Sequence, residues 1–197
     1  MSRGRGSLLV LLMMMLSSGC ALKSPELRSF TLSPSYRYGR VAHSPYREQS
    51  VKVAYPGNVR GKPGSSINFS YSRLEVGSYQ NAAWAASSSQ LLTGTIIRAL
   101  EHGAVFKSVI DYGSLANTDY LLESEIYDLY HRVRKNSSVS VVSIRFDLIS
   151  TEENRLVKSR KFSYEIPTGT VDAAGYVEAT NKALEKLSAD LVRWLAS

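Results

Sequence analysis

The sequence has a single cysteine, Cys20, among its 197 residues. One thiol excludes an intramolecular disulfide and a zinc site built from several cysteines. The histidines are as sparse: His43, His102 and His131 lie far apart, and none shares the spacing of a helical zinc motif with another. No serine lies in a Gly-x-Ser-x-Gly motif, which marks many hydrolases. We therefore expect a protein that is not an enzyme and that has neither a metal nor a cofactor.

Long hydrophobic runs and blocks of one charge are also missing. The longest apolar run, Leu8–Leu16, is too short to span a membrane, because a spanning helix needs about twenty such residues. The net charge of +7 is spread over the chain in small basic groups with acidic neighbours. Scattered charge of this kind is typical of a solvated surface. Nucleic acid is therefore not an expected partner.

The first twenty residues do carry a recognisable pattern. Two arginines precede the apolar run Leu8–Leu16, and small residues lead from it to Cys20. This order predicts a secretory signal peptide over residues 1–19. Its end resembles the lipobox of bacterial lipoproteins, in which the cysteine becomes the first residue of the mature chain and receives diacylglycerol and a further acyl chain such as palmitate. A multiply acylated Cys20 would anchor the protein stably, since a single lipid chain binds only reversibly.

The residues after the cysteine suggest where the anchor lies and how the chain is divided. Ala21 replaces the aspartate that, by resemblance to lipoprotein sorting rules, retains a lipoprotein at the inner membrane. We therefore expect the bacterial outer membrane, with the protein facing the periplasm. Residues 20–49 contain three of the six prolines and little periodicity, which predicts a lipidated tether with exposed tyrosines. Residues 50–197 are then long enough for one domain.

Within this domain, alternating patterns predict strands and 3.6-residue patterns predict helices. Strands are expected over residues 50–56, 67–84 (a hairpin), 104–110, 119–130, 138–150 and 155–167. A bulge near Tyr127 would reconcile the two halves of the first long strand. Helices are expected over residues 87–103 and 173–194. We predict an α+β fold, with a mixed, mainly antiparallel sheet of about five strands and two helices packed on one face.

Several motifs, taken in order, resemble the ABC-type transport auxiliary lipoproteins, a family that includes the Pqi-type outer-membrane lipoprotein. The first motif, YSRLEVGSYQNAAW, contains Tyr71, Leu74, Tyr79 and Trp84. Further along the chain lie ALEHGAVFKSV, TDYLLESEIYDL, VVSIRFDLI and KFSYEIP, and Trp194 ends the closing motif ATNKALEKLSADLVRWL. The resemblance implies that these five residues have a structural or docking role.

The resemblance also implies a function. It suggests a non-catalytic accessory component of an Mce-type lipid transport system, which docks the periplasmic component at the outer membrane. The implied partners are an Mce-domain periplasmic protein and the ABC transporter subunits. An envelope lipoprotein that scaffolds or activates another machine, in outer-membrane assembly or cell-wall synthesis, is the alternative. Self-association through a sheet edge and the tyrosines Tyr36, Tyr38 and Tyr46 also remains open.

Overall fold

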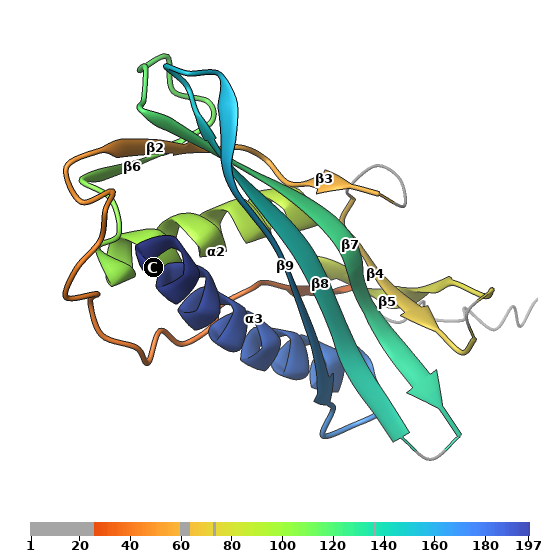
Figure 1. The fold of residues 1–197 in the computed structure, drawn as a ribbon. Coiled ribbons are helices and arrows are strands. Elements are labelled where there is room, and N and C mark those ends of the chain that lie inside the picture. Colours follow the sequence, from red (N-terminus) through yellow and green to blue (C-terminus); the bar gives the residue numbers. More distant parts are fainter. Residues whose placement is uncertain (1–25, 60–63, 73, 136) are drawn as a thin grey trace, which may run out of the picture.

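A computed structural model describes residues 26–59, 64–72, 74–135 and 137–197. Cys20 and the predicted signal peptide lie outside these residues. The described part contains two helices and a sheet of nine strands (Figure 1), so the predicted α+β class is confirmed. Neither helix combines the length and the apolar character that crossing a membrane requires.

The strands fall into six short elements and three long ones. In chain order they are β1 (Arg28–Phe30), β2 (Ser50–Val53), β3 (Gly57–Asn58), β4 (Ser66–Ser70), β5 (Gly77–Trp84), β6 (Ser108–Asp111), β7 (Tyr120–Arg134), β8 (Ser137–Ser150) and β9 (Arg155–Pro167). The helices are α2 (Ser88–Gly103) and α3 (Ala173–Ala196).

The long strands β7, β8 and β9 form an antiparallel meander. On β8, alternate side chains from Val142 to Leu148 are fully buried under the helices, because the two-residue period of a strand sends them all to one face. The register between β7 and β8 shifts between Ile126 and Asp128, so the bulge predicted near Tyr127 is confirmed. Neither helix of the described residues covers the opposite face of the meander (Figure 1).

The other edge of β7 is where the predicted sheet was wrong. Three short strands, β2, β3 and β4, pair with β7 one after another along this edge, all in parallel. With β1 beside β5 and β2 beside β6, five pairings are parallel and three are antiparallel. The described sheet is therefore mixed, as predicted, but it has nine strands instead of about five, and its short strands pair largely in parallel. Of the short strands, β1 and β3 are absent from the expected set, because two or three residues are too few to show an alternating pattern.

Both helices begin and end within two residues of the predicted termini, and both cover one face of the sheet. Ser87 caps α2 and forms a reciprocal capping box with Gln90. Asp172 caps α3 through a 2.8 Å hydrogen bond from the Gly175 amide. α3 packs on β8 and β9, and α2 packs on α3 and on the β2–β6 side (Figure 1).

The segment before β2 crosses the outside of the helical layer. The hydroxyls of Tyr36 and Tyr38 donate hydrogen bonds to the carbonyls of Thr95 and Ala99 in α2, at 3.0 and 3.1 Å. Tyr46 is buried, and its ring stacks on Phe106. From Arg28 onward, these residues are therefore integrated into the fold, and the three tyrosines expected to be exposed are half-buried or buried.

Candidate functional site

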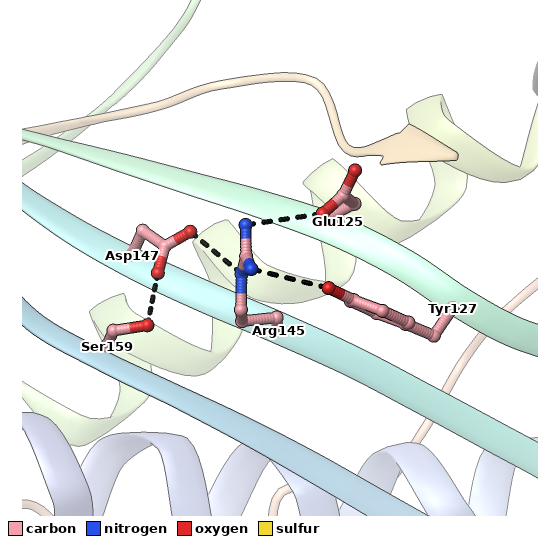
Figure 2. A network of polar contacts seen from close by, with 5 residues as sticks. All are labelled: Glu125, Tyr127, Arg145, Asp147 and Ser159. Atoms are coloured by element: carbon pink, nitrogen blue, oxygen red, sulfur yellow. Dashed lines mark hydrogen bonds and ion pairs between the residues drawn. The ribbon is translucent and has the colours of Figure 1, made fainter. Parts of the chain in front are cut away.

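The uncovered face of the meander carries a charged network centred on Arg145 of β8 (Figure 2). Its guanidinium forms ion pairs with Glu125 of β7 at 3.3 Å and with Asp147 at 3.0 Å. It also donates a hydrogen bond to the Tyr127 hydroxyl at 3.3 Å, and Ser159 of β9 donates one to Asp147. Hydrogen bonds and ion pairs thus connect outward-facing residues on three neighbouring strands. The two-residue period of a strand places these side chains on the same face, and antiparallel pairing places them opposite one another.

The arginine of this network stays protonated, and its ion pairs are exposed to solvent. The Asp147 carboxylate, followed by Tyr127, raises the pKa of Arg145, so the guanidinium stays protonated at all physiological pH values. The Lys161 ammonium lies 4.2 Å from the centroid of the Tyr127 ring, within cation–π range. Exposed ion pairs of this kind add little stability. Their chemistry suits recognition of a polar partner better than support of the fold.

A cleft of about 800 Å³ adjoins this network, between β3 and β4 along the edge of β7. β3 pairs with β7 as far as Ile126, and β4 pairs with it only from His131. Within the described part of the chain, no strand is registered opposite residues 127–130 on this edge. We call this the β7 cleft. Its lining residues include Asn58, Ser66, Asn68, Ser70, Trp84, Tyr127, Tyr130, Arg132 and Glu165.

The bulge links the cleft to the charged network. Tyr127, the residue at the bulge, lines the cleft and also accepts the hydrogen bond from Arg145. At the other wall, Arg132 forms an ion pair with Glu165 of β9. The cleft therefore has a polar rim with charges of both signs, and β7 lies along it. Such a site can bind a polar, extended polypeptide.

Two of the five motif residues, Tyr79 and Trp84, lie in a buried aromatic cluster. The Tyr79 hydroxyl is 2.7 Å from Nδ1 of His131, and the imidazole stacks between the rings of Tyr79 and Tyr176. Trp84 also contacts Tyr176, with ring centroids 6.0 Å apart. Both residues thus connect β5 to β7 and to the first turns of α3.

Burial determines the protonation of this cluster. It lowers the pKa of His131 and raises that of Tyr79 to about 12, so both side chains are neutral at pH 7. A phenol with a raised pKa is not an activated nucleophile, and the imidazole is inaccessible. The hydrogen bond therefore has a structural role. The strand expected over residues 119–130 stops just before His131, but the residue lies within β7, and no sequence motif marked its burial.

The remaining motif residues do not join this cluster. Tyr71 and Leu74 lie in the turn between β4 and β5, where the Tyr71 ring packs against Phe69 and Leu74 is 98% exposed. Trp194 lies in the last turn of α3 against Phe162. The five motif residues thus divide into two core positions, two turn positions and one helix-packing position. Over the described residues, no group of three or more His, Cys, Asp or Glu side chains could hold a metal ion.

The sequence and the fold both have counterparts. A family model described as ABC-type transport auxiliary lipoprotein component matches residues 65–192. A crystal structure of a Xanthomonas campestris protein is similar at a TM-score of 0.70 and 21% identity, over 86% of this chain and 94% of that one. A crystal structure of a second, uncharacterized protein has a TM-score of 0.66 and 14% identity, over 86% of this chain and 99% of that one. No curated protein matches the sequence. At these identities the two structures establish the fold alone.

Proposed function

The chain belongs to the family of ABC-type transport auxiliary lipoprotein components, and we propose that it is the non-catalytic outer-membrane component of an Mce-type lipid transport system. In this role it is acylated at Cys20, faces the periplasm and docks the Mce-domain protein of the transporter. ATP hydrolysis and substrate passage belong to the partner chains. The described residues supply a binding surface for this role.

The observation that carries the docking proposal is the β7 cleft itself, a hollow of about 800 Å³ with polar walls and charges of both signs on its rim. The part of β7 that lines it, from Ile126 to Arg132, spans about 20 Å, enough to seat a short extended segment of a partner. Serine and asparagine side chains on β4 line the cleft and can hydrogen-bond to the main chain of such a segment. We assign the cleft to an extended segment of the Mce-domain protein.

The function is tested by a crosslinking pull-down of the full-length lipoprotein from its native envelope. We expect recovery of an Mce-domain protein, and we expect Cys20→Ser to abolish it because the chain is no longer held at the outer membrane. Recovery of a cell-wall synthase or of an outer-membrane assembly subunit instead would contradict the transport role and favour the alternative envelope role.

A matched pair of variants tests the docking surface. Ser66 is exposed on the wall of the cleft, so Ser66→Trp fills the cleft without disturbing the core. Ser35 is equally exposed but lies on the segment that crosses the helices, and Ser35→Trp is the control. We expect the first variant to lose the Mce-domain protein and the second to retain it. Equal recovery with both variants would exclude the cleft as the docking surface.

A further inference from the structure

Exposed apolar side chains gather at one end of the domain. Half of the ten exposed large hydrophobic residues in the described part lie there: Leu27 (59% exposed), Tyr71 (59%), Leu74 (98%), Val76 (62%) and Val171 (60%). We call this group the entry end. Single exposed apolar residues need no explanation, but a group contributed by three separate segments marks an interaction surface.

Strand pairing places these segments together. β4 runs parallel to β7, with Ser70 opposite Arg132, so the β4–β5 turn lies beside the end of β7. Pro167 at the end of β9 pairs with Val139 near the start of β8, so the loop before α3, which contains Val171, lies at the same end. Figure 1 shows the β4–β5 turn and the ends of β7 and β9 on one side of the molecule.

The chain also enters the domain at this end. β1 runs parallel to β5, with Arg28 opposite Ala82 and Phe30 opposite Trp84, so the first residue of β1 faces the end of the sheet where β5 begins, at Gly77 and the β4–β5 turn. Five residues separate Cys20 from Glu26, and the six extended Cα–Cα steps between them reach at most about 20 Å. An acylated Cys20 therefore holds the entry end within about 20 Å of the bilayer surface. β7 is 15 residues long, so the opposite end of the domain lies roughly 50 Å from the entry end along this strand.

From this arrangement we propose that the entry end is a second membrane contact, in which Leu74 and Val76 enter the bilayer interface beside the lipid anchor. The proposal rests on the acylation assigned to Cys20 under the proposed function. The β4–β5 turn supplies an aromatic ring and two aliphatic side chains, a combination that favours the boundary between headgroups and acyl chains. This contact fixes the orientation of the domain, with the long axis of β7 pointing away from the membrane.

Charge does not drive this contact. At the entry end, the exposed Arg134 and Lys135 are offset by the exposed Glu26 and Glu75. Insertion therefore depends on apolar burial and on the short connection to Cys20, and we expect it in zwitterionic vesicles as well as in anionic ones. Dependence on anionic lipid alone would contradict this reasoning.

Two leucines provide a matched test. Leu74 is 98% exposed at the entry end, and Leu115 is 100% exposed in the loop between β6 and β7 at the opposite end. Cys20 is the only native cysteine, so in the acylated full-length chain Leu74→Cys and Leu115→Cys each add one free thiol for a polarity-sensitive fluorophore. The proteins are reconstituted into phosphatidylcholine vesicles with and without doxyl-labelled lipid. The mass of the Cys20 peptide reports acylation.

We expect the fluorophore at position 74 to shift to the blue and to be quenched by doxyl lipid at least twofold more than the one at position 115. Equal exposure to water at both positions in an acylated chain would overturn the membrane contact while leaving the proposed function intact. A blue shift without doxyl quenching would also overturn it, because protein then covers the turn. If the peptide mass shows an unmodified Cys20, the lipid anchor is refuted. In such a chain, doxyl quenching at position 74 would still support the membrane contact. No quenching at position 74 would refute the membrane contact together with the anchor.

Discussion

Removing the Tyr79 hydroxyl tests whether this motif residue acts through the core. The hydroxyl lies 2.7 Å from Nδ1 of His131, and the imidazole is fully buried. Its other nitrogen, Nε2, has no hydrogen-bond partner among the described residues. Tyr79→Phe keeps the aromatic ring and leaves the imidazole without this bond. A buried polar group left unsatisfied costs about 1–3 kcal/mol, so we expect the free energy of unfolding to fall by about that amount.

A double-mutant cycle isolates the hydrogen bond. Replacing both partners of a buried hydrogen bond with apolar groups is often nearly neutral, so Tyr79→Phe combined with His131→Leu should lose less stability than the two single variants sum to. Urea unfolding of the purified protein at pH 7.5, followed by tryptophan fluorescence, measures each value. A Tyr79→Phe protein within about 0.5 kcal/mol of the parent, or a strictly additive double variant, would refute the structural role of the bond.

Three further predictions concern the same fold. Burial lowers the pKa of His131 below its ordinary value, so the unfolded chain binds more protons below about pH 6.5 and stability should fall as the pH drops from 7.5 to 5. Urea midpoints at both pH values should show this loss, and His131→Leu should reduce it. A Cβ at Gly103 would lie 2.6 Å from a methyl group of Val192, so Gly103→Ala should destabilise the α2–α3 contact by about 1–3 kcal/mol in thermal melts. Combining Gly103→Ala with Val192→Ala should lose less stability than the two single variants sum to. Strictly additive losses of stability would refute the clash. Because the Arg145 network is exposed, Arg145→Gln should leave the unfolding midpoint almost unchanged but weaken recovery of the Mce-domain protein; a normal pull-down would remove the network from the docking surface.

Long, periodic segments were predictable from the sequence. The apolar stripe of α3 from Ala173 to Leu191 is buried as its 3.6-residue spacing indicated. The serine cap of α2 and the bulge at Tyr127 also appear where local chemistry and broken alternation placed them. In each case the signal is carried by neighbouring residues, so no knowledge of distant contacts was needed.

The edge of β7 was not predictable in this way. β2, β3 and β4 are two to five residues long, and their parallel pairing with β7 joins residues some sixty positions apart. The β7 cleft lies where the pairing of β3 with β7 ends and that of β4 begins, so it depends on the same distant contacts. The burial of His131 and Tyr46 likewise arises from tertiary packing and has no local signature.

Docking at the β7 cleft is the central claim, and a photocrosslinking amino acid placed in the native envelope tests it most directly. Tyr127 lies at the bulge on the wall of the cleft, and Tyr112 is 53% exposed after β6, away from the cleft. We predict that the crosslinker at position 127 captures an Mce-domain protein and that the crosslinker at position 112 does not. Capture from position 112 alone, or capture of a cell-wall synthase or an assembly subunit from position 127, would contradict the account.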